Sequence, residues 1–221
     1  MFDDLLWRQP RAKVATDPVG HRLYGFGKRV ADIALVLLGG PFIVPVVALL
    51  AALIMLDGGS PFYSQSRVGR HGRVFQLWKL RSMVPDADAR LASYLESCPE
   101  ARAEWDTAQK LKCDPRLTRI GHYIRRYSLD ELPQLWNVLI GDMSLVGPRP
   151  MMREQRLLYP GTAYFDLRPG LTGPWQISAR NNCSFAGRAA YDNSYAKSVS
   201  ATTDIQILLR TVGVVLRGTG C

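Results

Sequence analysis

An apolar run from Val30 to Leu56 constrains this chain more than any other feature, because Asp32 is its only charged residue. A helix that crosses a bilayer needs about 20 consecutive apolar residues, so this run is long enough to cross once. A run of this length is seldom buried in a small soluble domain, and a soluble core helix is therefore the third and least favoured interpretation. The sequence predicts a segment that enters a membrane.

Glycine and proline interrupt the middle of this run at Gly40 and Pro41, and Pro45 follows one turn later. Proline removes a backbone hydrogen bond and clashes with the preceding turn of a helix. We therefore expect two arms, 30–40 and 42–56, joined at a bend at Gly40 and Pro41. Neither arm alone has the length that a membrane-spanning helix needs.

Basic residues flank the run on both sides. They are Arg22, Lys28 and Arg29 before it, and Arg67, Arg70, Arg73, Lys79 and Arg81 after it. Because positive residues mark the cytoplasmic side of a membrane, a segment that enters and leaves through one face explains both basic ends. The pattern favours a re-entrant helical hairpin over a kinked helix that crosses the bilayer. It divides the chain into a polar leader (1–27), a re-entrant membrane segment (28–58) and a domain on the cytosolic face (59–221).

The composition points to an anionic partner. The net charge of the 221-residue chain is +9, which suits nucleic acid, anionic lipid or a phosphorylated substrate. The four cysteines are scattered, without a CxxC pair or zinc spacing, and indicate reduced thiols in the cytosol. We expect no signal peptide, because charged residues interrupt the first positions and no apolar run precedes Val30.

Residues 61–83 show two short alternations of apolar and polar residues around a glycine-containing turn, which predicts a β-hairpin. Lys79 and Arg81 alternate along one strand and therefore share a face. On that face they either bind substrate or contact lipid headgroups.

Helical periodicity predicts two helices between residues 86 and 111, broken near Pro99. A further helix over 204–217 places its apolar residues on one face, which suits either a protein core or a membrane interface. The fold class expected from these patterns is α+β: a mainly helical domain with a short β-hairpin and an N-terminal membrane hairpin.

Two adjacent carboxylates, Asp130 and Glu131, lie between arginines at the start of a predicted helix. Pro133 suits the first position of this helix, since its missing N–H has no partner there, and Gly141 ends it. In an alternative register Ser128 caps the helix and Glu131 is its capping-box partner, which is a purely structural role. In both registers Asp130 faces the positive end of the helix, which favours its ionised form.

These carboxylates suit phosphoryl chemistry. An ionised carboxylate can act as a nucleophile or as a Mg²⁺ ligand, and Arg125, Arg126 and Arg149 can neutralise phosphate oxygens nearby. The sequence has no Walker loop and no Rossmann glycine fingerprint, and its three histidines lie in unrelated contexts, which argues against a serine triad. A substrate with phosphate at one end and lipid at the other would account for the acids, the arginines and the apolar run together.

The stretch SLDELPQLWNVLIGDMSLVGPRP (128–150) resembles the bacterial sugar transferase family, the monotopic polyprenyl-phosphate phosphoglycosyl transferases. The segments RVGRHGRVFQLWKLRSM (67–83) and RPGLTG (168–173) are similar to the same family, and the resemblance extends over about residues 28–218. The chain departs from the family pattern at Gly40, Pro174, Ala179 and Val199.

This resemblance implies that hexose 1-phosphate, with galactose or glucose as the hexose, passes from a UDP-sugar to undecaprenyl phosphate. UMP is released, and the reaction is the first step of exopolysaccharide or capsule synthesis. Asp130 falls on the family's nucleophile, which forms an aspartyl phosphosugar, and Glu131 assists with metal or proton handling. Mg²⁺, or Mn²⁺, is the implied cofactor, held by the same two acids. The positions implied to bind phosphate or nucleotide are Arg125, Pro148, Arg149, Lys79 and Arg81.

The resemblance also implies a place at the cytoplasmic face of the bacterial inner membrane, with 59–221 as the catalytic domain and a C-terminal interfacial helix. The implied partners are membrane lipid, downstream glycosyltransferases and a second copy in a homodimer, without nucleic acid. Transfer from a UDP-N-acetylhexosamine is an alternative within the family. A non-catalytic basic adaptor at the membrane surface is an alternative of another class, but a surface that binds polyanions gains nothing from two acids at its centre.

Overall fold

The computed structural model describes residues 18–108, 111, 113–178 and 185–218. Its elements are α1 (Pro18–Met55), β1 (Phe62–Val68), η1 (Arg70–Gly72), β2 (Val74–Leu80), α2 (Ala87–Ser97), α3 (Pro99–Ala108), α4 (Arg119–Arg126), η2 (Leu129–Glu131), α5 (Gln134–Ile140), β3 (Ser144–Val146), η3 (Glu154–Leu158), α6 (Ala163–Asp166), β4 (Gly170–Thr172), α7 (Pro174–Ser178), α8 (Arg188–Ser198) and α9 (Ala201–Leu216). The predicted α+β class is confirmed, as are the hairpin at 61–83 and the helix break near Pro99. The departure at Ala179 lies outside the described residues.

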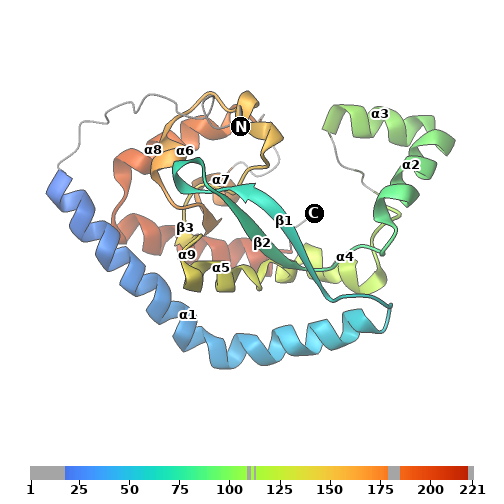
Figure 1. The fold of residues 1–221 in the computed structure, drawn as a ribbon, viewed down its shortest axis with the longest axis horizontal. Helices are drawn as coiled ribbons and strands as arrows, with labels where there is room; N and C mark the ends of the chain where they lie inside the picture. The colour runs from blue at the N-terminus through green and yellow to red at the C-terminus, as the bar shows by residue number, and fades with distance from the viewer. Residues whose placement is uncertain (1–17, 109–110, 112, 179–184, 219–221) are drawn as a thin grey trace, which may run out of the picture.

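Helix α1 is continuous through both Pro41 and Pro45, so the predicted division into two arms is wrong. The predicted bend is present within this single helix, as Figure 1 shows. A helix can bend around a proline when the freed backbone groups lie at its surface, and both prolines are exposed here. The helix begins at Pro18, so residues 18–27, which we assigned to the leader, form its first turns. Among the described residues, one stretch, Tyr24–Met55, is long and apolar enough to cross a membrane.

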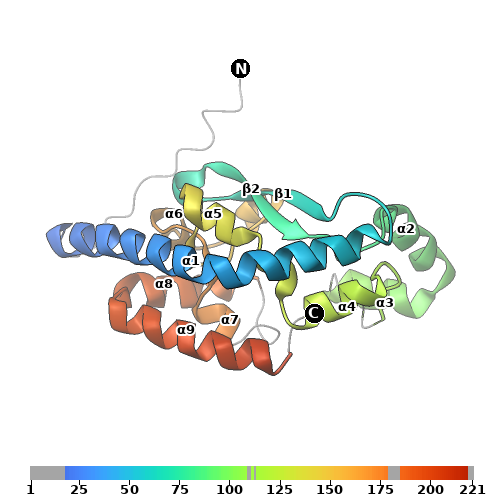
Figure 2. The same cartoon turned by 90° about the horizontal axis from the view of Figure 1, so that it is seen from below.

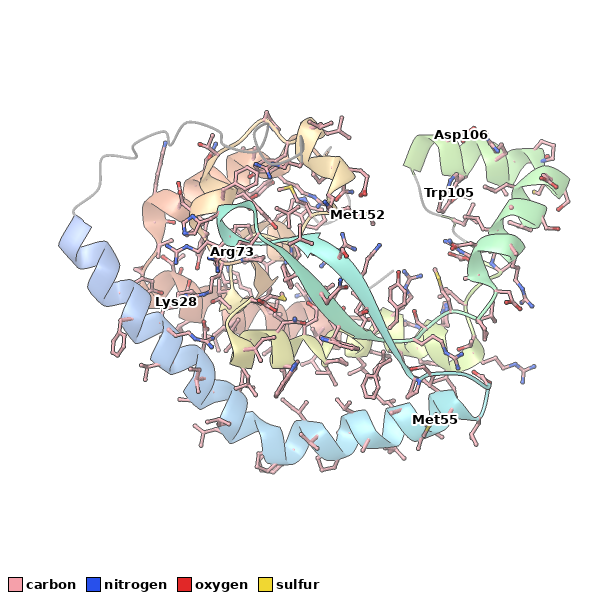
Figure 3. The ribbon with its side chains drawn as sticks, viewed as in Figure 1. Lys28, Met55, Arg73, Trp105, Asp106 and Met152 are labelled. Carbon is pink, nitrogen blue, oxygen red and sulfur yellow. The ribbon has the colours of Figure 1, made fainter. Side chains whose placement is uncertain are left out.

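The first half of α1 is fastened to the domain by polar contacts. Tyr24 Oη donates a hydrogen bond of 2.7 Å to Asp204 Oδ2 in α9, and Lys28 Nζ forms an ion pair with the same oxygen. The guanidinium of Arg29 donates to the main-chain carbonyls of Val138 and Leu139 near the end of α5. Figure 3 shows Lys28 on the side of α1 that faces the domain.

The second half of α1 packs on the same domain through apolar contacts. Ala51 and Ile54 are buried in one cluster with Leu80 of β2 and Ile124 of α4. Arg81 Nη2 donates a 3.0 Å hydrogen bond to the carbonyl of Ile54. Both halves of the bent helix therefore dock on one globular body.

Apolar side chains remain exposed on α1 and on its neighbours α5 and α9. Figure 2 shows α1 with α5 on one side of it and α9 on the other. The exposed side chains include Leu37, Leu38, Phe42, Val44, Trp136, Ile140, Ile205, Leu209, Val212 and Leu216. Helix α9 also turns Asp204 and Ile207 into the interior, so it meets the core and carries an exposed apolar stripe.

Strands β3 and β4 form a short parallel pair beside the buried residues Val138, Met143 and Val146. Gly147 follows β3, and its amide donates to the carbonyl of Thr172 at 2.9 Å. The backbones approach so closely that a Cβ on Gly147 would lie 2.3 Å from the Arg168 carbonyl oxygen. Only glycine fits here without moving the backbone.

We expect Gly147→Ala to lower the free energy of unfolding by about 1–3 kcal/mol, because overpacking forces the strand pair apart. Urea unfolding of the purified chain measures this loss. Gly213→Ala is the matched control: within the described structure a Cβ at Gly213 meets nothing within 4 Å, and alanine in a helix interior is worth about 0.5–1 kcal/mol over glycine. Equal stabilities for the two variants would contradict the close approach at Gly147.

Candidate active site

Asp130 and Glu131 lie in the single turn η2, between α4 and α5. Ser128 enters this turn in the left-handed region, with φ of 55°, and in the described structure its side chain forms no capping hydrogen bond. Pro133 directly precedes α5 and Gly141 ends it with φ of 95°, as the pattern predicted. The serine half of the capping box is therefore not formed.

Two further side chains meet these carboxylates. Lys79 Nζ, from β2, lies 3.2 Å from Asp130 Oδ2 and 3.1 Å from Glu131 Oε1. Arg149 Nη2 lies 3.2 Å from the same Glu131 oxygen. We call Lys79, Asp130, Glu131 and Arg149 the acid cluster.

Burial sets the electrostatics of Asp130, which is 7 % exposed. Desolvation raises the pKa of its carboxyl, the charge of Lys79 opposes the rise, and the charge of Glu131 adds to it. Arg125 also lowers this pKa, which places its guanidinium within electrostatic reach. Lys79 and Arg125 therefore favour the charged form of Asp130 and burial opposes it, while the contribution of the helix end stays a prediction.

Arg67 is a member of this site that the sequence analysis did not single out. It lies on β1, on the hairpin face that carries Lys79, because the pairs Tyr63–Lys79 and Arg67–Phe75 share one side of the ladder. Burial and the charge of Arg149 lower its pKa, while Glu131 raises it. The Arg-Val-Gly opening of the hairpin motif was the available signal, but only the strand register shows which side this arginine faces.

The other predicted site residues have different positions. The carbonyl of Pro148 accepts a 2.8 Å hydrogen bond from the amide of Gly170 in β4, which fastens the chain between β3 and Arg149. Arg81 binds the carbonyl of Ile54 and does not join the acid cluster, although it follows Lys79 by two residues. Gly40 and Pro41 lie near the middle of α1, where Gly40 is half-buried and Pro41 is exposed.

The donor set fits a hard divalent cation. Mg²⁺ is commonly held by one or two carboxylates, with waters and substrate phosphates completing its shell. Asp130 and Glu131 supply two such carboxylates side by side. The ammonium of Lys79 forms a salt bridge with both of them. Among the described residues no group of three His, Cys, Asp or Glu side chains could hold a metal ion.

The arrangement can accept a phosphorylated substrate. Lys79 and Arg125 bring positive charge to Asp130, and Arg149 and Arg67 bring it to the adjacent Glu131. Cations of this kind bind phosphate oxygens by charge-assisted hydrogen bonds. A phosphorus atom held there would face Asp130 as a nucleophile.

Comparison with known proteins agrees with this chemistry. The bacterial sugar transferase family model matches residues 23–218. The chain is 48% identical over 197 residues to a UDP-galactose-lipid carrier transferase of Erwinia amylovora, covering 88% of this chain and 41% of that protein. It is 44% identical over 197 residues to an undecaprenyl-phosphate galactose phosphotransferase of Salmonella typhimurium, again 88% of this chain and 41% of the other.

A third relative has nearly the same length. The exopolysaccharide production protein ExoY of Sinorhizobium fredii is 41% identical over 214 residues, which covers 96% of this chain and 93% of that protein. The chain thus spans about two fifths of the first two relatives and nearly all of the third. Because the family model matches almost the whole described chain, the protein belongs to the bacterial sugar transferase family.

Proposed function

We propose that this protein transfers a hexose 1-phosphate from UDP-galactose or UDP-glucose to undecaprenyl phosphate, as the first step of exopolysaccharide or capsule synthesis. The observation that carries the proposal is the acid cluster, in which a buried carboxylate lies among cations that can hold a diphosphate. The names of the Erwinia and Salmonella relatives support the lipid carrier and galactose, and the name ExoY supports exopolysaccharide production.

The chemistry divides into two displacements at one phosphorus. In the first, a carboxylate oxygen of Asp130 bonds to the phosphorus next to the sugar, and the bond from that phosphorus to UMP breaks. In the second, an oxygen of the lipid phosphate bonds to the same phosphorus and releases Asp130. Lys79 and Arg149 screen the repulsion between phosphates in both steps. Mg²⁺ or Mn²⁺, held by Asp130 and Glu131, would stabilise negative charge on the diphosphate and on the leaving oxygen.

We further propose that α1 enters and leaves the membrane through the cytoplasmic face of the inner membrane. Both of its halves dock on the same domain, through Asp204 and Val138 at one end and Ile124 at the other, so that domain lies on one side of the bilayer. The exposed apolar middle of α1 is then the part that enters lipid, with the apolar stripe of α9 at the interface.

Pro41→Leu tests this topology, because it restores the missing backbone donor and favours a straighter helix. A straight α1 cannot keep both ends on the domain, so we expect part of the population to cross the membrane. In a chain whose own cysteines are serine, a cysteine replacing Gly25 is labelled with an impermeant thiol reagent on intact cells. We expect labelling with Pro41→Leu but none with the matched control Val44→Leu. Identical labelling in the two backgrounds would contradict the re-entrant arrangement.

The function itself is tested by release of UMP from a panel of UDP-sugars, with undecaprenyl phosphate and Mg²⁺ supplied. We expect UMP with UDP-galactose or UDP-glucose, and lipid-linked sugar phosphate as the second product. If only UDP-N-acetylhexosamines are turned over, the donor sugar differs from the proposed one but the reaction is the same. No release with any donor would favour a non-catalytic membrane adaptor.

A further inference from the structure

A cavity of about 350 Å³ lies between α1, the hairpin turn, β3, α6 and α8. Its walls include Lys28, Arg70, Ser144 and Arg168, and no member of the acid cluster lines it. The volume falls within the range of small-molecule sites, about 300–1,000 Å³. We call this space, which is separate from the candidate active site, the α1 cavity.

Two guanidinium groups line the α1 cavity, and within the described part of the chain neither forms a salt bridge. Arg70 Nε donates to the main-chain carbonyl of Asp166 at 3.0 Å, and Arg168 Nε donates to that of Gly141 at 3.1 Å. Burial and the charge of Arg168 lower the pKa of Arg70, while the charge of Asp166 raises it. An anion between the two arginines would turn their mutual repulsion into attraction.

A buried hydroxyl of the same cavity also lacks a partner. Ser144 is 1% exposed, and its Oγ has no hydrogen-bond partner in the described part of the chain. A buried polar atom without a partner destabilises the folded state, and a hydrogen bond to a ligand oxygen would remove that cost. This second observation is independent of the arginines and points to a polar ligand.

Two other charged residues at the cavity already have partners within the protein. Lys28 is paired with Asp204, and Asp32 Oδ1 accepts a 3.2 Å bond from the Leu145 amide. Four basic and two acidic residues line the walls, so the excess charge is positive. Figure 3 shows Lys28 reaching from α1 toward the domain at this junction.

We propose that the α1 cavity is a second anion site, which binds the phosphate group of a small phosphate ester or of a lipid headgroup between Arg70 and Arg168, with Ser144 bonding to the same ligand. Because α1 forms one wall and the domain the others, the ligand would fasten the membrane helix to the domain. The proposal goes beyond the transferase function and does not depend on turnover.

The test measures thermal unfolding of the full chain in maltoside micelles, which contain no phosphate. One arm adds glycerol 3-phosphate, and the other adds phosphatidylglycerol to the micelles. A ligand that binds the native state raises Tm in a saturable way. We expect such a rise in one arm or both, and the arm that shows it identifies a free ester or a headgroup as the source.

Variants assign the effect to the cavity. Arg70→Gln should weaken the apparent affinity about ten-fold, as expected for the loss of a charge-assisted hydrogen bond. Ser144→Ala should weaken it less while leaving the ligand-free Tm unchanged or higher, because it removes an unsatisfied hydroxyl. Arg73→Gln is the matched control: it removes the same charge from an exposed neighbour at the same turn and should change nothing.

Two results would overturn the proposal. One is the absence of a rise in Tm in both arms. The other is a rise that Arg149→Gln abolishes and that neither Arg70→Gln nor Ser144→Ala weakens, since binding would then belong to the acid cluster. Asp130→Asn should keep the rise in Tm. The outcome of this test therefore does not depend on whether the proposed transfer reaction takes place.

Discussion

Asp130→Asn is expected to reduce turnover by about 10⁴-fold or more, the scale on which removal of a nucleophile acts. The amide has nearly the shape of the carboxylate but cannot form the acyl phosphate bond to the sugar-bearing phosphorus. Folding should survive, because the change removes a charge that burial already disfavours. UMP release by membranes that carry equal amounts of the two proteins measures the effect.

Detection of the covalent adduct distinguishes the role of Asp130 from that of Glu131. After a rapid quench of the enzyme with donor alone, mass spectrometry should find a phosphosugar on Asp130. Glu131→Gln, a substitution of the same kind one residue away, should slow formation of this adduct without moving it. Asp106→Asn, an exposed aspartate of α3, is the control for charge alone. An adduct on another residue, or substantial turnover by Asp130→Asn, would remove Asp130 as the nucleophile.

Lys79→Met is expected to lower turnover at neutral pH by about 10²-fold, because it removes the cation that both acids share. The charge of Lys79 lowers the pKa of Asp130, so its loss raises that pKa further. The ionised form is the nucleophile, and a higher pKa means that less of it exists at a given pH. The acid limb of the rate profile should therefore move to higher pH, with partial recovery of activity in alkaline buffer.

A complete pH profile of UMP release, from pH 5 to pH 9, measures this shift. Lys197→Met, at an exposed lysine of α8, is the matched control and should leave the profile unchanged. If Lys79→Met lowers the rate equally at every pH, Lys79 acts on the substrate phosphates alone and not on the ionisation of Asp130.

The sequence by itself determined the local elements and the candidate acids. Alternation around a glycine turn predicted the hairpin, Pro99 predicted the break between α2 and α3, and Gly141 predicted the end of α5. These features depend on backbone preferences of neighbouring residues, which a chain carries wherever it folds. The adjacent acids and the long apolar run were equally visible, because each occupies one continuous stretch.

Only the tertiary structure decided what those residues contact. It brought Lys79 to Asp130 across 51 positions of sequence and Arg149 to Glu131 across 18, added Arg67 to the site, and turned Arg81 away to α1. It also kept α1 continuous through two prolines, because contacts at both ends hold the bend within one helix where the sequence predicted two separate arms. Strand register, burial and long-range ion pairs have no local signal, and for that reason they appear only once the chain has folded.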